Sequence, residues 1–136
     1  MIECIVGKMG SGKTKQLVDR LNSTVAQEKG NVLCIEKGKK LLTDVNYAVR
    51  LVDIEKYPIS GYDQLFSFIC GLYAANFDTC SIFIDSLYKV AGCKDHAKID
   101  QFIQKLEAFS EINNVKFGIT ISDDIENCPA SIKKHL

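Results

Sequence analysis

Short apolar segments alternate along the chain with longer segments whose apolar residues recur at helical spacing. The short segments are mostly unbroken by polar residues, which is typical of strands in a sheet that is buried on both faces. The predicted strands are Ile2–Val6, Gly30–Glu36, Val49–Ile54, Ser81–Asp85 and Val115–Ser122.

The segments between the predicted strands show the spacing of α-helices. Leu17, Leu21 and Val25 follow one another at intervals of four residues and therefore share one helix face. The other predicted helices are a short one at Lys39–Val49, one that begins with a capping box at Ser60 and Asp63, one that carries Ile99, Phe102, Ile103, Leu106 and Phe109 on one side, and a short final one with Pro129 in its first turn.

This alternation of strands and helices predicts an α/β protein with a three-layer αβα fold and a mostly parallel sheet of about five strands. Right-handed crossovers would place helices on both faces of the sheet. The length of 136 residues fits one domain, residues 1–136, with one core. The composition, 46% hydrophobic and 25% charged, is that of an ordinary globular protein.

The net charge and the cysteine pattern give no support to several classes of binding protein. The formal net charge is zero, so no bulk electrostatic signal indicates nucleic acid or an anionic membrane as a partner. None of the six cysteines forms a C-x-x-C pair, which argues against a zinc knuckle or a dithiol redox motif. The first predicted strand leaves no room for a signal peptide, and the most apolar helical stretch, Leu65–Ala75, is too short to span a membrane. We therefore expect a cytoplasmic protein.

The stretch GKMGSGKT lies between the first predicted strand and the first predicted helix, and it fits the pattern G-x-x-x-x-G-K-[ST]. Glycines let the backbone curl around a phosphate chain, and the helix N-terminus directs free N–H groups at the anion. Lys13 is expected to contact the β- and γ-phosphates during catalysis, and Thr14 to bind Mg²⁺. The alternative is a glycine turn without a ligand. The expected nucleotide-binding residues are Gly7, Lys8, Met9, Gly10, Ser11, Gly12, Lys13 and Thr14.

On this motif the sequence resembles the P-loop NTPase superfamily, and the alternating strands and helices extend the resemblance along nearly the whole chain. The resemblance implies that the ligands are a nucleotide and Mg²⁺. ATP is preferred because the guanine signature N/T-K-x-D is absent. Asp85, at the carboxyl end of a predicted strand, matches the Walker B aspartate, which would share the Mg²⁺ with Thr14. The alternative is an ordinary aspartate at a strand end.

Hydrolysis needs a group that orients or deprotonates water. Many ATPases place a glutamate directly after the Walker B aspartate, but Ser86 occupies that position here. Glu36, at the end of the second predicted strand, is the candidate catalytic residue; recombinase- and KaiC-like ATPases resemble this arrangement, and they share the sequence IDSL at Ile84–Leu87. Alternatively, Glu36 caps the next turn or pairs with a neighbouring lysine.

Two further groups of polar residues belong to no motif. The end of the last predicted strand is interpreted as solvated loop residues and a helix cap, with γ-phosphate sensing as the alternative. Arg20 and Arg50, the only arginines, show no signal of an arginine finger. The polar residues at the end of the last strand are Thr120, Ser122, Asp123 and Asp124.

Three functions remain open. The first is a Mg²⁺-dependent ATP-binding protein with slow ATPase activity that acts as a switch or regulator. The second is a nucleotide-binding protein without turnover, whose bound state is read by partners. The third is a small nucleoside or nucleotide kinase, because bacterial-type thymidine kinases are similar at the loop and share a methionine at the place of Met9. Against a kinase, the chain lacks a Glu after Asp85, paired cysteines and an arginine-rich lid. A homo-oligomer or a protein partner is compatible with each function.

Overall fold

The computed structural model describes residues 1–136 and contains a single five-stranded sheet. Every pair of neighbouring strands is parallel, and the strand order is β1-β5-β4-β2-β3. The prediction of a mostly parallel sheet of about five strands is confirmed. The strands span Ile2–Gly7 (β1), Asn31–Glu36 (β2), Arg50–Asp53 (β3), Thr79–Ile84 (β4) and Lys116–Ser122 (β5).

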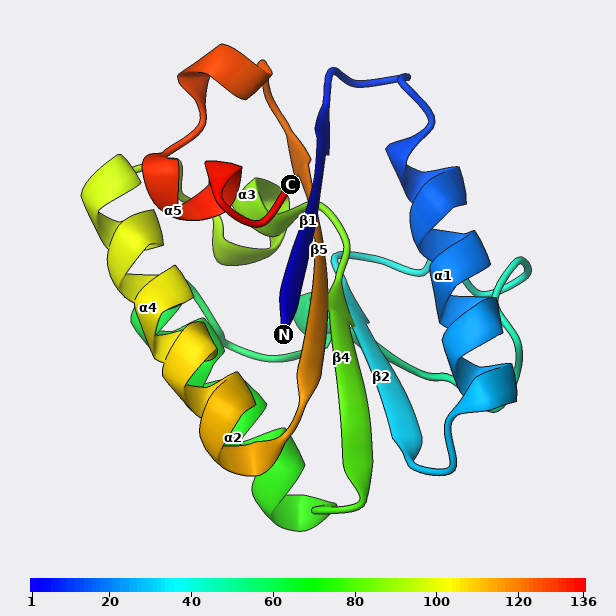
Figure 1. The fold of residues 1–136 in the computed structure, drawn as a ribbon. Helices are drawn as coiled ribbons and strands as arrows, with labels where there is room; N and C mark the ends of the chain where they lie inside the picture. Colours follow the sequence, from blue (N-terminus) through cyan, green and yellow to red (C-terminus); the bar gives the residue numbers. More distant parts are fainter.

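Helices cover both faces of the sheet, which confirms the three-layer αβα fold (Figure 1). α1 packs on one face, whereas α2 and α4 pack side by side on the other. No helix combines the length and the apolar character needed to cross a membrane. The helices span Lys13–Gln27 (α1), Tyr62–Ala75 (α2), Leu87–Ala91 (α3), His96–Asn113 (α4) and Ala130–Lys133 (α5), with 3₁₀ turns at Ile54–Lys56 and Ile125–Asn127.

The strands are buried on both faces because successive side chains point to opposite sides. In β2, Val32 and Cys34 pack in the cluster that contains α1, whereas Leu33 and Ile35 pack in the cluster that contains α2 and α4. The same alternation directs the next residue, Glu36, toward the side of α1. In β4, Phe83 packs in the cluster that contains α1, so Asp85, two residues later, is directed to the same side. Glu36 and Asp85 therefore share one side of the sheet.

The segment predicted as a helix at Lys39–Val49 is a series of turns, so that prediction is wrong. Leu41 and Val45 are buried four residues apart and are joined by one helical-type hydrogen bond, Val45 N–H to Leu41 O. That single turn produced the helical signal. The rest of the segment is held by side chains of other elements; for example, Asn22 on α1 accepts a hydrogen bond from Asn46 N–H.

Two helix starts also differ from the predictions. α2 begins at Tyr62 after Gly61, whose φ of 84° requires the conformational freedom of glycine, and no side chain caps it. Ser60 instead donates its N–H to the Gln64 side chain, so the predicted capping box is absent. α3 was not predicted, because its five residues are too few to show helical periodicity.

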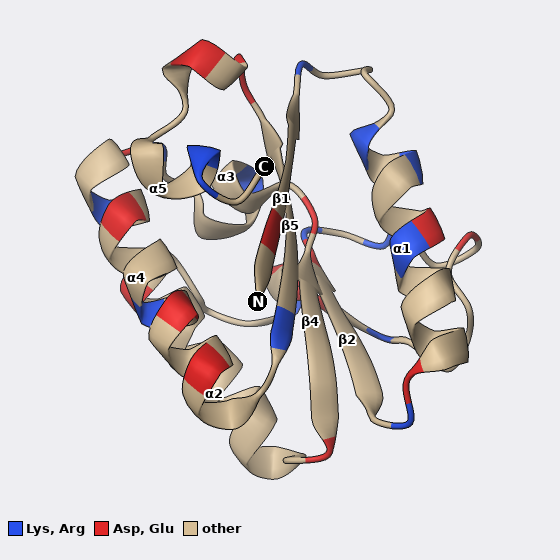
Figure 2. Ribbon diagram, viewed as in Figure 1, with Lys and Arg blue, Asp and Glu red and all other residues tan.

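Charged residues lie mainly on helices and loops, and the strands are largely free of them (Figure 2). The parallel arrangement brings the carboxyl ends of all strands to one edge of the sheet, where ligands bind in open α/β sheets. Gly7, Glu36, Asp53 and Ser122 are the last residues of their strands, and Asp85 directly follows β4. The fold therefore gathers the predicted site residues at the same edge.

Candidate functional site

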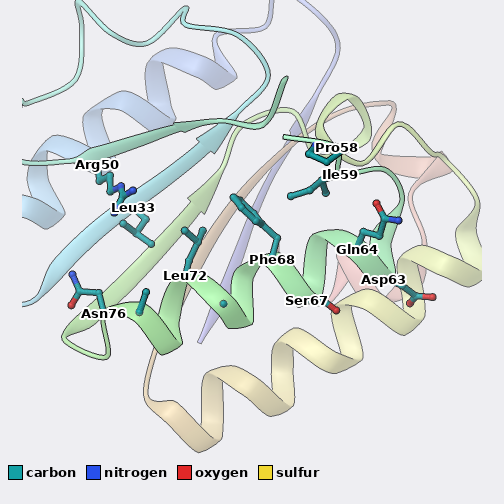
Figure 3. A pocket seen from close by; sticks show the side chains of 12 residues that line it. Leu33, Arg50, Pro58, Ile59, Asp63, Gln64, Ser67, Phe68, Leu72 and Asn76 are labelled. Atoms are coloured by element: carbon teal, nitrogen blue, oxygen red, sulfur yellow. The ribbon is translucent and has the colours of Figure 1, made fainter. Parts of the chain in front are cut away.

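The glycine loop, defined here as Gly7–Thr14, lines a cavity of about 680 Å³ at the carboxyl-end edge of the sheet. A larger cavity of about 860 Å³ runs along α2 (Figure 3), but only Arg50 and Asp63 among its lining residues are charged. Most residues that line the cavity at the glycine loop are charged, so we assign the candidate site to it. Its charged lining residues are Lys8, Lys13, Lys40, Lys89, Lys94, Asp85, Asp123 and Asp124.

The glycine loop turns tightly and leads directly into α1. Gly10 and Gly12 have φ values of 81° and 86°, a region that other residues rarely adopt. At Gly7, an added Cβ would lie 2.5 Å from Ser11 Oγ, so a side chain there would force the Ser11 hydroxyl to move. No side chain caps the first turn of α1, whose N–H groups are therefore available to an anion.

Lys13 is the only buried lysine of the chain, with 7% of its surface exposed. Its ammonium group donates a hydrogen bond of 3.0 Å to the carbonyl of Lys8, within the same loop. A buried charge with one neutral partner has lost much of its hydration, so a bound anion would stabilise it strongly. Lys13 thus places a positive charge with a single protein partner in the lining of the cavity.

Asp85 is buried, and one of its oxygens is fixed by Thr120 on β5. The Thr120 hydroxyl donates to Asp85 Oδ1 at 2.8 Å and accepts the Ser86 N–H at 2.7 Å. Ser86 adopts φ 60°, a left-handed conformation that costs energy in a residue other than glycine. Thr120 is completely buried, so its interpretation as a solvated loop residue is wrong. Its hydroxyl instead fixes the Asp85 carboxylate relative to the turn at Ser86.

The residues available to Mg²⁺ are Thr14 and Asp85, which line the same cavity. The Thr14 side chain is exposed and its hydroxyl forms no hydrogen bond within the protein, while Asp85 keeps its second carboxylate oxygen. Nowhere in the structure do three or more His, Cys, Asp or Glu side chains form a metal-binding group. Two oxygen ligands fit Mg²⁺, because this ion usually takes its other ligands from water and substrate phosphates.

Glu36 lies beside Asp85 along the sheet edge but is engaged by its own loop. Its Oε1 accepts the N–H groups of Lys40 at 3.1 Å and Leu41 at 3.3 Å. Burial raises the pKa of Glu36 above its ordinary value, and the charges of Asp85 and Asp53 add to this effect. Glu36 lines a neighbouring cavity of about 400 Å³ rather than the cavity at the glycine loop. It therefore caps the turn, and its catalytic role stays a prediction.

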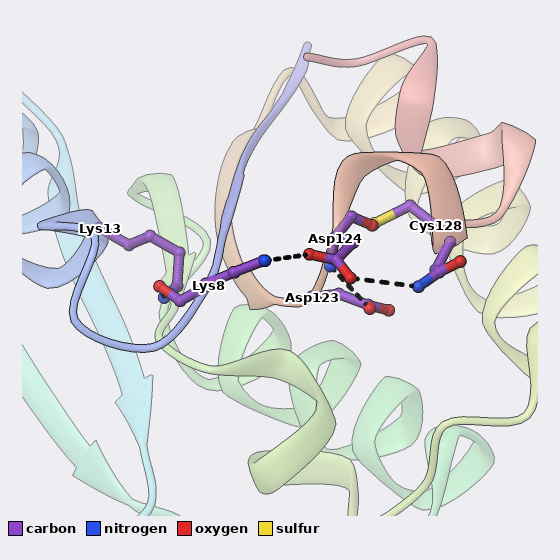
Figure 4. A network of polar contacts seen from close by, with 6 residues as sticks. Lys8, Lys13, Asp123, Asp124 and Cys128 are labelled. Atoms are coloured by element: carbon purple, nitrogen blue, oxygen red, sulfur yellow. Dashed lines mark hydrogen bonds and ion pairs between the residues drawn. The ribbon is translucent and has the colours of Figure 1, made fainter.

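The segment after β5, whose residues Asp123 and Asp124 line the cavity, faces Lys8 of the glycine loop (Figure 4) and forms the far wall of the cavity. Lys8 Nζ lies 3.4 Å from Asp124 Oδ1, so this lysine links the glycine loop to that wall. Asp123 accepts hydrogen bonds from the Tyr88 hydroxyl and from the Asp124 N–H. Burial raises the pKa of Tyr88, and the hydrogen bond to Asp123 adds to this shift. The wall is thus ordered by polar contacts, with Ser122 also in its lining.

Three lysines in this cavity escaped the sequence analysis. Lys40 follows Glu36 in the basic run KGKK, Lys89 lies four residues after Asp85, and Lys94 follows α3. The only signal in the sequence was their closeness to the two acidic strand ends. The two arginines, in contrast, lie outside the cavity lining: Arg20 pairs with Glu3, and Arg50 lines the larger cavity along α2.

The sequence matches no protein-family model, and no curated protein is significantly similar to it. The role of the site therefore has to be inferred from its own geometry and from the motif in the glycine loop.

Proposed function

We propose that the protein binds ATP with Mg²⁺ at the glycine loop and hydrolyses it slowly, and that it acts as a small nucleotide-dependent switch. The observation that carries this proposal is the pairing of a buried ammonium, Lys13, with a buried carboxylate, Asp85, in the lining of one cavity at the uncapped start of α1. Polyphosphate and a divalent cation are together the complementary ligand for these two groups. The GKMGSGKT motif, shared with P-loop NTPases, supports the same assignment.

Each residue has a distinct task in this proposal. The N–H groups of the glycine loop bind phosphate oxygens. The Lys13 ammonium group gives up its hydrogen bond to the Lys8 carbonyl and binds the phosphates instead. Thr14 and Asp85 would hold Mg²⁺, which neutralises charge on the phosphates when it is bound. Thr120 keeps Asp85 in position through its hydroxyl.

Turnover in this proposal depends on Glu36, which lies beside the buried Asp85 at the sheet edge although it lines the neighbouring cavity. Since Oε1 of Glu36 already binds two N–H groups of its loop, the proton of an attacking water would go to Oε2. A base that is partly engaged in this way fits slow hydrolysis. The same engagement supports a second candidate function, a nucleotide-binding protein without turnover.

The proposal is tested by calorimetric titration of Mg·ATP into the wild type, Lys13→Ala and the control Lys15→Ala. Lys15 is the second residue after Lys13, is exposed, and does not line the cavity. We expect Lys13→Ala to weaken binding by about 100-fold, because a buried charge-assisted contact to phosphate is lost, and Lys15→Ala to bind like the wild type. Equal affinities for all three proteins would refute the nucleotide site. Release of free phosphate by the wild type then separates a slow ATPase from a binding protein.

A further inference from the structure

A further cavity, of about 380 Å³, adjoins the glycine-loop cavity, and four of its six lining residues are lysines. Two of them, Lys40 and Lys89, line both cavities. We call this space the basic cavity; its lining residues are Lys37, Gly38, Lys39, Lys40, Glu55 and Lys89.

The backbone that carries three of these lysines is held in place by carboxylates at the ends of two strands. Asp53, the last residue of β3, accepts the Gly38 N–H at 2.8 Å, and Glu36 accepts the N–H groups of Lys40 and Leu41. The hydrogen bond from Gly38 makes the largest contribution to the lowered pKa of Asp53. The turn is anchored further by Leu41, which is 1% exposed. The lysines are therefore presented by an ordered segment.

The four lysines of the basic cavity are exposed, and the carboxylates of Asp53 and Asp85 act on Lys39 and Lys89 only at longer range. None of its four lysines forms an ion pair, and Glu55 is the only carboxylate in the lining. The nearby Lys40 amine lowers the pKa of Lys89, so these two side chains are close enough to repel each other. This concentration of positive charge occurs in a chain whose formal net charge is zero. An anion bound between the lysines would relieve the repulsion.

We propose that the basic cavity binds the phosphate group of a second, small ligand beside the nucleotide. The four lysines supply point charges suited to a phosphate dianion, and no apolar residue lines the cavity. Lys40 and Lys89 place this phosphate on the Asp85 side of the nucleotide site. A small phosphorylated molecule fits better than a nucleic acid, because the lysines surround one cavity and no aromatic residue lines it for base stacking.

This inference rests on the proposed function only in the identity of the neighbouring ligand. If both hold, the two ligands are coupled, because Lys40 and Lys89 face both of them. The second phosphate would then make the state of the nucleotide site depend on a phosphorylated small molecule.

The test is a ³¹P NMR titration of inorganic phosphate and, separately, methyl phosphate, with and without a saturating non-hydrolysable ATP analogue and Mg²⁺. The proteins are the wild type, Lys37→Gln/Lys39→Gln, and the matched control Lys29→Gln/Lys98→Gln. Lys37 and Lys39 line the basic cavity but not the glycine-loop cavity, and neither control lysine lines either cavity. Binding of methyl phosphate alone would identify a phosphomonoester as the ligand; binding of both probes would admit free phosphate.

We expect the Lys37→Gln/Lys39→Gln protein to bind the phosphate probe about tenfold more weakly than the wild type and the control, with its affinity for the analogue unchanged. Equal phosphate binding by all three proteins, or none by the wild type, would overturn the second site. Tighter binding of a 12-residue single-stranded oligonucleotide than of either probe would overturn it in favour of nucleic acid. If the analogue fails to bind but the phosphate effect persists, the second site stands and the proposed function fails.

Discussion

Asp85 and Glu36 end adjacent strands of the sheet, point to the side of α1 and are both buried, yet their surroundings differ. Asp85 receives one hydrogen bond, from the Thr120 side chain, and lines the cavity at the glycine loop. Glu36 receives two hydrogen bonds from the backbone of the turn that follows it and lines another cavity. Asp85 keeps one carboxylate oxygen without a hydrogen bond within the protein, whereas Glu36 binds the backbone of its own turn.

The difference shows that a position at the carboxyl end of a strand does not by itself define a catalytic acid. The role of such a carboxylate depends on which groups donate hydrogen bonds to it. The Thr120 side chain, on a neighbouring strand, orients Asp85 and leaves its second oxygen free. In contrast, the backbone N–H groups of the turn after β2 donate their hydrogen bonds to Glu36.

The largest effects are expected from the paired amide variants Asp85→Asn and Glu36→Gln. Each keeps an oxygen that can accept the native hydrogen bonds, so the fold should be retained. Asp85→Asn removes the charge that would bind the metal, and the gain in ATP affinity provided by Mg²⁺ should fall by about 10- to 100-fold. Titrations of ATP with Mg²⁺ and with EDTA measure this gain.

Glu36→Gln should bind Mg·ATP like the wild type but lose turnover by about 100-fold or more, because an amide cannot accept the proton of water. A phosphate-release assay measures the loss. If hydrolysis continues unchanged, Glu36 serves only its turn; if Asp85→Asn keeps the full effect of Mg²⁺, the contrast between the two acids is wrong.

A smaller effect is expected from Thr120→Val, which keeps the shape of the side chain but removes the hydroxyl between Asp85 and Ser86 N–H. The variant should lose about 1–3 kcal/mol of unfolding free energy and bind Mg·ATP several-fold more weakly. Thr79→Val is a matched control, because the Thr79 hydroxyl donates to a backbone carbonyl at the opposite end of β4. Urea unfolding should show a loss for both variants, and weaker nucleotide binding should occur only for Thr120→Val.

The smallest effect concerns pH. Burial raises the pKa of Glu36 in the folded protein above its ordinary value of 4.5, so folding favours the protonated form. The stability that Glu36 contributes is complete below that value and is lost as the pH rises through the raised pKa. Relative to Glu36→Gln, the wild type should therefore gain unfolding free energy as the pH falls from 7 toward 4.5. Urea unfolding of both proteins across this range measures the difference, and a gain in the opposite direction would contradict the burial effect.

The sequence predicted most of the fold because each core strand carries an unbroken apolar run. The order of the strands could not be predicted, since apolar runs do not encode which neighbours they pair with. The segment at Lys39–Val49 was misassigned because Leu41 and Val45 have helical spacing over a single turn. At the start of that segment, Asp53 accepts the N–H of the preceding Gly38 and Glu36 accepts the N–H of Lys40, and no local pattern reveals these two contacts.

For the candidate site, the sequence predicted that the glycine loop and Asp85 lie together, because each has a fixed place relative to a strand end, and both line one cavity. It missed the role of Thr120, which depends on β5 lying between β1 and β4. It also missed Lys40 and Lys89, because their approach to one another is created by the turn after β2 and by α3. Residues whose function depends on spatial neighbours from other strands are the ones that sequence patterns leave unassigned.

The place of β5 between β1 and β4 has a consequence for how the chain is made. β5 is the last of the five strands in sequence order, yet it lies between the strand that leads into the glycine loop and the strand that Asp85 follows. Until residues 116–122 emerge, β1 has no partner in the sheet and Asp85 lacks the Thr120 hydroxyl. The glycine loop and Asp85 are therefore joined through the sheet only after residues 116–122 have been synthesised.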